Sequence, residues 1–144
     1  MTYAITYLVA LVLFAAIDIS WLMTMGSKLY RQTLGDVLLT ELRIAPAAAF
    51  YLMYPAGLVI FAVIPALKSG SPATALLLGA LLGLFAYGTY ELTNFATIRN
   101  WTLQITLIDI AYGIVASGVV AAIVAMVVPY VAGAADSQPA GLRR

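Results

Sequence analysis

The sequence predicts an all-α, polytopic membrane protein: a bundle of four transmembrane helices with a short interfacial helix in the first loop. Two observations support this fold class. The chain of 144 residues is 64% hydrophobic and 9% charged, whereas soluble domains have about 45–50% apolar and about 25% charged residues. Four windows are also long enough to cross a bilayer, which needs about 20 mainly apolar residues. These windows are residues 3–25, 46–67, 73–95 and 102–129.

The four windows use most of the chain, so we expect a single transmembrane domain over residues 1–130 and a flexible tail over residues 131–144. The tail sequence "AGAADSQPAGLRR" is rich in small and polar residues, as disordered segments are. The first window differs from a secretory signal, because it lacks a positively charged start, has a longer apolar run and contains Asp18. We therefore expect it to persist as a helix.

The longest connection, residues 26–46, carries apolar residues at helical spacing. These are Leu34, Val37, Leu38 and Leu42, with charged residues between them. The pattern predicts a short amphipathic helix at the membrane interface. A solvated loop is the alternative.

The other two connections, "KSGSPA" and "TIRN", are short turns. Short turns make successive helices antiparallel. Both ends of the domain then lie on one side of the membrane, side A, and the long loop and the "TIRN" turn lie on side B. Basic residues are Lys28, Arg31, Arg43 and Arg99 on side B, and Lys68, Arg143 and Arg144 on side A. The positive-inside rule favours side B in the cytoplasm by a narrow margin.

Three carboxyl groups, those of Asp18, Glu91 and Asp109, fall inside predicted helices. An acid within a membrane span costs about 2.5–3.5 kcal/mol on insertion scales, so it is expected to face a cavity or the bundle interior. At a rise of about 1.5 Å per residue, Asp18 and Asp109 lie roughly 10 Å from the side-B end of their helices, and Glu91 roughly 6 Å. We therefore expect the three acids at one level, on three different helices.

Aromatic and amide side chains occur at the same level, and at helical spacing they share one face with the acids on each helix. The candidate ligand-binding or proton-linked residues are Asp18, Trp21, Tyr51, Tyr54, Tyr87, Tyr90, Glu91, Asn94, Asp109 and Tyr112. If these faces turn inward, the side-B half of the bundle encloses a polar pocket. Tyr30 and Trp101 lie nearer the ends of the spans and suit an interfacial aromatic belt.

The side-A half is expected to be closed by small residues that allow close helix packing. These residues are Ala75, Gly79 and Gly83 on the third helix, and Ala121 and Ala125 on the fourth. Pro55 removes one backbone hydrogen bond from the second helix beside Tyr54, so we expect this helix to be loosened at the pocket.

Five segments together resemble a known family: "DISWL" (18–22), "LYRQTLG" (29–35), "FYLMYPAGLVIFAVIPAL" (50–67), "YGTYELTNFATIRNW" (87–101) and "TLIDIAYG" (106–113). The chain is similar to the predicted bacterial membrane proteins called domain of unknown function 2177. The resemblance implies a four-helix, multi-pass protein, which we place in the bacterial inner (cytoplasmic) membrane. It implies no established activity.

A structural role is the alternative for each candidate. Protonated Asp18 and Asp109 could fix the helix register through hydrogen bonds to Asn94, Tyr54 or Thr106. Glu91 could instead form a salt bridge with Arg99, Arg43 or Lys28. Trp21 and Tyr112 could serve in packing, and Asn94 could cap the end of its helix.

Composition excludes several kinds of site. The chain has no Cys and no His, so disulfides, thiol chemistry and the usual zinc and di-iron sites are absent. We expect no metal and no cofactor. A net charge of +1 gives no reason to expect a nucleic-acid partner.

Three functions remain. The first, which we favour, is binding or transport of a small amphipathic or lipid-like ligand in the pocket lined by carboxyl groups and tyrosines. The second is an enzyme that acts on a lipid or isoprenoid by acid/base chemistry, with Asp18 and Asp109 as acid and base and Tyr54 or Tyr90 as proton donor. The third is an accessory structural subunit of a larger membrane complex. The lipid bilayer is the expected partner in each case, and a homodimer is compatible with transport.

Overall fold

A computed structural model describes residues 2–35 and 38–136, and every regular element in these ranges is helical. The elements in chain order are α1 (Thr2–Met25), a π-helical turn (Gly26–Tyr30), α2 (Arg31–Leu34), α3 (Ile44–Leu58), a second π-helical turn (Val59–Val63), α4 (Ile64–Ser69), α5 (Pro72–Thr97) and α6 (Leu103–Asp136). Four continuous stretches are long and apolar enough to cross a membrane: Tyr3–Leu34, Ile44–Ser69, Pro72–Thr97 and Leu103–Gly133. The predicted fold class, a helical protein with four membrane-spanning helices, is therefore confirmed.

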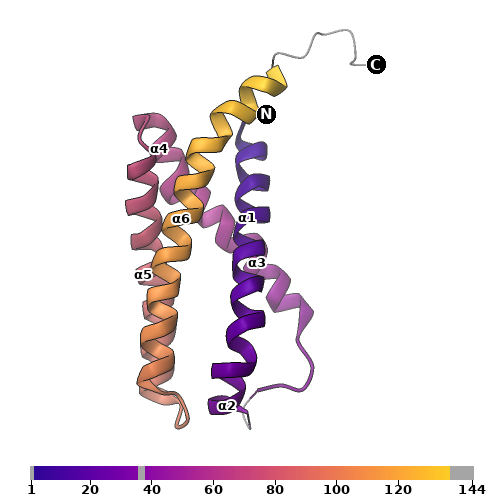
Figure 1. Ribbon diagram of the computed structural model, residues 1–144, viewed down its shortest axis with the longest axis vertical. Helices are drawn as coiled ribbons and strands as arrows, with labels where there is room; N and C mark the ends of the chain where they lie inside the picture. Colours follow the sequence, from indigo (N-terminus) through magenta and orange to yellow (C-terminus); the bar gives the residue numbers. More distant parts are fainter. Residues whose placement is uncertain (1, 36–37, 137–144) are drawn as a thin grey trace.

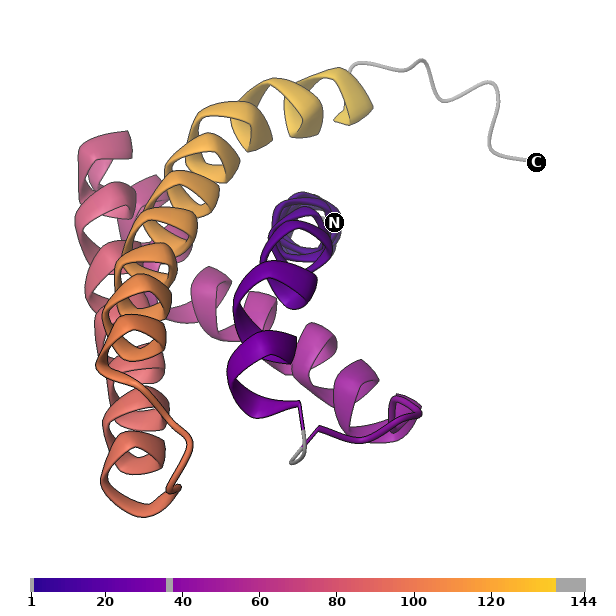
Figure 2. The same ribbon diagram turned by 60° about the horizontal axis from the view of Figure 1, so that its bottom comes forward.

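The helices run antiparallel, as the short turns predict. Figure 1 shows α5 and α6 side by side, with α1 beside them and α3 crossing obliquely behind. Figure 2 shows the same oblique course of α3 from a second direction. The start of α1 and the ends of α4 and α6 lie at one end of the molecule, side A, and α2 and the α5–α6 turn lie at the other, side B (Figure 1).

The second membrane-spanning stretch changes helical form in its middle. Pro55 is buried inside α3, and the π-helical turn Val59–Val63 follows one turn later, before α4 begins with Pro65 in its first turn. Because proline has no N–H, the helix loses one backbone hydrogen bond at this place. The helix keeps α geometry at Tyr54 and Pro55, so the loosening expected beside Tyr54 is not seen there, and the departure from α geometry lies further towards side A, at Val59–Val63.

Small residues let α5 and α6 touch through their backbones. A Cβ added to Gly83 would lie 2.1 Å from the backbone oxygen of Gly113, and one added to Gly79 would lie 2.6 Å from that of Ser117. Ala121, on the same face of α6, is fully buried. The close packing predicted from these residues is present, and it joins the α5–α6 pair tightly.

The side-A half contains the hydrophobic core. Its buried members come from α1, α3, the second π-helical turn, α4, α5 and α6, and they include Ala10, Phe14, Leu58, Ala62, Val63, Ala75, Val120, Ala121, Val124 and Val128. Many large apolar side chains point outward on the described part of the chain, such as Val12, Met53 and Phe85, which are 68%, 70% and 66% exposed. An apolar exterior of this kind suits contact with lipid.

The helix in the first loop lies earlier than the apolar spacing predicts. No residue between Met25 and Leu34 stops the helix, so α1 continues through the π-helical turn and α2 as far as Leu34. Residues 38–43 form no helix, so the amphipathic helix predicted to reach Leu42 is wrong in this part. Val37 lies outside the described residues. At the other end of the chain, α6 extends to Asp136, so residues 131–136 of the expected tail are helical.

Candidate functional site

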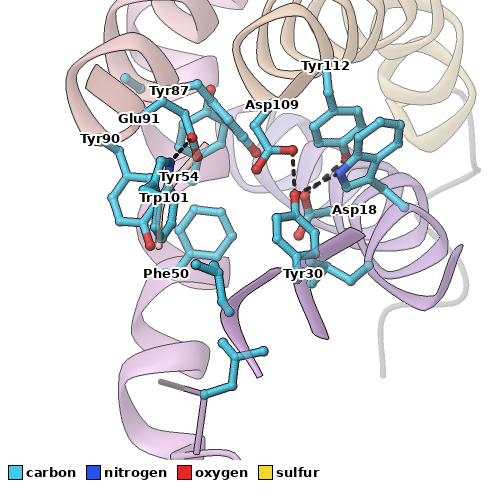
Figure 3. Close-up of a pocket in the computed structure, with 15 residues that line it drawn as sticks. Asp18, Tyr30, Phe50, Tyr54, Tyr87, Tyr90, Glu91, Trp101, Asp109 and Tyr112 are labelled. Carbon is cyan, nitrogen blue, oxygen red and sulfur yellow. Dashed lines mark hydrogen bonds between the residues drawn. The ribbon is translucent and has the colours of Figure 1, made fainter. Parts of the chain in front are cut away.

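The side-B half contains a cavity of about 590 Å³, which is within the range of small-molecule sites. Every one of the four membrane-spanning stretches contributes to its wall, together with the first loop and the α5–α6 turn. The lining residues are Asp18, Trp21, Leu22, Tyr30, Leu34, Leu38, Phe50, Tyr54, Ala86, Tyr87, Tyr90, Glu91, Trp101, Asp109 and Tyr112. Figure 3 shows the acids and aromatic rings gathered around this space.

The three predicted acids meet at this cavity from three helices. Asp18 on α1, Glu91 on α5 and Asp109 on α6 all line it, and they are 5%, 1% and 6% exposed. The cavity explains why α5 tolerates a carboxyl group near its end. Glu91 faces protein and the cavity, away from hydrocarbon.

Asp18 links α1 to two other helices. Its Oδ1 accepts a hydrogen bond of 3.0 Å from the hydroxyl of Tyr112 on α6, and its Oδ2 accepts one of 2.9 Å from the hydroxyl of Tyr51 on α3. The ring of Tyr112 stacks on Trp21, with centroids 4.2 Å apart and planes 9° from parallel. Position and orientation of the Asp18 carboxyl group are therefore fixed from both sides.

Asp109 is held by a short relay of donors. The indole N–H of Trp21 donates to the hydroxyl of Tyr30 over 3.4 Å, and that hydroxyl donates to Oδ1 of Asp109 (Figure 3). Tyr30 belongs to the π-helical turn after α1. The continuation of the first helix past Met25 therefore brings this phenol to the acid.

Glu91 accepts a hydrogen bond of 2.8 Å from the indole N–H of Trp101 and interacts with the neighbouring carboxyl group of Asp109. The salt bridge to Arg99, Arg43 or Lys28 that the sequence allowed is not found among the described residues, and Glu91 is hydrogen-bonded to an indole instead. No Lys or Arg is found among the described residues that line the cavity. The charged side chains of its wall are all acidic.

Aromatic rings form a continuous wall between the acids and the core. The ring of Tyr87 packs edge to face on the rings of Tyr54 and Tyr112, with centroids 6.0 Å and 5.9 Å apart. The hydroxyl of Tyr54 pairs with Ser117 Oγ at 2.7 Å. The ring of Phe50 packs on Tyr54 as well, with centroids 5.6 Å apart.

The sequence profile of one protein family, described as predicted membrane protein (DUF2177), matches residues 3–126. The chain belongs to the DUF2177 family. The resemblance seen in the five motifs is thereby confirmed over a longer stretch. No curated protein and no solved structure matches the chain. This family description establishes a membrane protein and gives no activity.

Eight of the ten candidate residues line the cavity of the DUF2177 chain: Asp18, Trp21, Tyr54, Tyr87, Tyr90, Glu91, Asp109 and Tyr112. Tyr51 reaches Asp18 by a hydrogen bond but lines a neighbouring cavity. Asn94 lines neither, and its side-chain nitrogen is buried without a hydrogen-bond partner among the described residues. Asn94 also does not cap its helix by its side chain, because α5 continues to Thr97 with Ile98 at the cap position.

Sequence reasoning missed two aromatic residues that hold the acids. Tyr30 and Trp101 suited an interfacial belt, yet they donate hydrogen bonds to Asp109 and Glu91. The partners considered for Asp18 and Asp109 were also wrong: Tyr54 pairs with Ser117, and the hydroxyl of Thr106 donates to the backbone oxygen of Thr102, just before α6. The absence of proline between Met25 and Leu34 is the signal that could have placed Tyr30 correctly.

Proposed function

We propose that this DUF2177 protein binds a small amphipathic ligand within the side-B half of the membrane. The apolar part of the ligand lies among the aromatic rings and its polar end faces the acids. One observation carries the proposal: a cavity of about 590 Å³ is bounded by three acids and eight aromatic side chains. The eight aromatic side chains are those of Trp21, Tyr30, Phe50, Tyr54, Tyr87, Tyr90, Trp101 and Tyr112.

The aromatic wall favours an apolar or flat ligand body. Ligand sites in proteins combine mostly hydrophobic and aromatic walls with a few convergent polar groups, and this cavity has that composition. The rings are held by one another and by hydrogen bonds, as in the stack of Trp21 on Tyr112. A wall that is already ordered loses little conformational entropy when a ligand binds.

The hydrogen-bond pattern favours a ligand whose polar end donates hydrogen bonds. Each ionised carboxyl group accepts about four hydrogen bonds, and the acids receive one or two from Tyr and Trp side chains. The wall therefore offers acceptors, while most of its donors are already used. A protonated amine would supply the missing donors and a positive charge beside three acids and aromatic faces. A phosphate or carboxylate head would meet like charge instead.

The closed side-A half favours binding over free passage across the membrane. The backbone contact of Gly79 and Gly83 with α6 and the buried core lie between the cavity and side A. Transport would require this half to open, and a single four-helix chain lacks the two related halves that alternating access usually uses. We place the protein in the bacterial inner membrane, with the cavity nearer the cytoplasmic side.

Intrinsic fluorescence tests the proposal at the site itself. The chain has two tryptophans, and both of them line the cavity. Bromine quenches indole emission on contact, so bromododecylamine added to the protein in nanodiscs should quench strongly. Bromododecanol should quench less, and bromododecanoic acid least, because the acid is repelled by the carboxyl groups of the wall.

Matched variants separate binding in the cavity from quenching through lipid. Ala86 lines the cavity, and Ala86→Phe should reduce quenching by the amine because the new ring takes up ligand space. Ala96 is exposed on the same helix, and Ala96→Phe should quench as the wild-type protein does. Equal quenching by all three probes, or unchanged quenching in Ala86→Phe, would show that the cavity is not the binding site.

A further inference from the structure

A second cavity of about 450 Å³ lies beside the first, between α1 and the start of α3. Its lining residues are Asp18, Leu22, Leu39, Leu42, Arg43, Pro46, Ala47, Phe50 and Tyr51. Three of them, Asp18, Leu22 and Phe50, also line the main cavity. The two spaces are therefore separated by a partition of side chains.

One hydrogen bond helps to hold this partition closed. The carboxyl group of Asp18 bonds to Tyr112 in the wall of the main cavity and to Tyr51 in the wall of the second. Leu22 is 46% exposed, whereas Phe50 packs edge to face on Tyr51 with ring centroids 5.2 Å apart. Exposed side chains change rotamer within picoseconds to nanoseconds, so Leu22 can turn aside without movement of a helix once the bond between Asp18 and Tyr51 breaks.

The outer side of the second cavity suits the lipid interface. Leu39 and Leu42 are 60% and 80% exposed, and they lie in the part of the first loop that has no helix. Arg43 is the basic residue of this wall. Apolar side chains with an arginine beside them are typical of a surface that contacts acyl chains and lipid phosphates.

Two other sides of the main cavity are closed more firmly. On the α5–α6 side, the backbones touch at Gly83 and Gly113, so widening that contact would require helix separation. Between α1 and α6, Trp21 stacks on Tyr112, which also bonds to Asp18. The side between α1 and α3 is closed by the hydrogen bond between Asp18 and Tyr51 and by the side chain of Leu22, which is 46% exposed.

We propose that the second cavity is a lateral portal through which a membrane-dissolved amphiphile reaches the main cavity. This inference rests on the proposed function and adds the source of the ligand, which is the bilayer. The ligand passes between Leu22 and Phe50 after the bond between Asp18 and Tyr51 opens. Arg43 marks the outer mouth of the portal at the level of the lipid headgroups.

The rate of quenching tests the portal separately from binding. Bromododecylamine is mixed with nanodisc-embedded protein in a stopped-flow instrument, and tryptophan emission is followed. Ala47 lines the second cavity alone, so Ala47→Phe should slow quenching about tenfold, because a ring must be displaced at each passage. The control is Ala48→Phe, one residue along the same helix at an exposed position, which should leave the rate unchanged.

A second variant acts in the opposite direction. Tyr51→Phe removes the hydroxyl that bonds to Asp18 and keeps the ring, so quenching should become about fivefold faster. Equal rates in Ala47→Phe and Ala48→Phe, or no acceleration in Tyr51→Phe, would overturn the portal. These outcomes leave the binding site intact if Ala86→Phe still lowers the final extent of quenching. The proposed function fails by itself if Ala86→Phe quenches as fully as the wild-type protein.

Discussion

Trp101 donates a hydrogen bond of 2.8 Å from its indole to Glu91, ten residues earlier in the chain. The donor lies in the turn after α5 and the acceptor is buried in the last third of α5. The turn that joins α5 to α6 is thereby folded back onto the cavity wall. Trp101 also meets Tyr90 edge to face at 5.8 Å, so two side chains of α5 hold the indole in place.

We expect Trp101→Phe to lower the free energy of unfolding by about 1–3 kcal/mol, because a buried carboxyl group would lose its donor. Denaturation in mixed detergent micelles, followed by circular dichroism, measures the change. Because the substitution also removes volume, Trp101→Phe should be combined with Glu91→Met, which removes the acceptor, in a double-mutant cycle. Additive effects in this cycle would mean that the hydrogen bond contributes nothing to stability.

Two glycines of α5 should respond in opposite ways to alanine. A Cβ at Gly83 would lie 2.1 Å from the backbone oxygen of Gly113, whereas one at Gly88 would have no atom within 4 Å. We expect Gly83→Ala to destabilise the protein by about 1–3 kcal/mol, since α5 and α6 must separate. Gly88→Ala should stabilise it by up to about 1 kcal/mol through helix propensity. Thermal unfolding of both variants in one detergent compares them directly, and equal melting temperatures would contradict the close contact.

The hydroxyl of Tyr112 should contribute more to the stability of the protein than the hydroxyl of an exposed tyrosine. Tyr112→Phe removes the donor to Asp18 and keeps the ring that stacks on Trp21. The expected cost is about 1–3 kcal/mol of unfolding free energy, the usual cost of leaving a buried polar group without its partner. Tyr3→Phe is the control, because Tyr3 is 68% exposed near the start of α1. If both variants unfold alike, Asp18 does not depend on this hydroxyl.

The helices and the level of the acids could be predicted because both depend on local sequence. The length of an apolar run decides whether a segment can span the bilayer, and the rise per residue then sets the depth of Asp18, Glu91 and Asp109. The small residues of α5 and of α6 could be predicted to share one face of each helix for the same reason, because spacing along a helix determines which residues lie on the same face.

Hydrogen-bond partners could not be predicted, because they depend on how helices rotate and cross. Tyr51 and Tyr54 are one turn apart on α3, yet the oblique course of this helix brings Tyr51 to Asp18 and Tyr54 to Ser117. Likewise, Tyr30 reaches Asp109 only because the first helix continues past Met25. Tertiary arrangement, and not local pattern, decides these contacts.

Cysteine labelling tests the membrane orientation. The chain has no cysteine, so single substitutions introduce single reporters. Ser69, at the side-A end of α4, and Asn100, in the α5–α6 turn at side B, are both exposed, and these two connections lie at opposite ends of the molecule (Figure 1).

In sealed cells, a membrane-impermeant maleimide should label Ser69→Cys and spare Asn100→Cys, because the side with more basic residues stays in the cytoplasm. Permeabilised cells should label both proteins. The reverse pattern would place side B outside, labelling of both in sealed cells would indicate dual insertion, and labelling of neither would contradict the antiparallel topology.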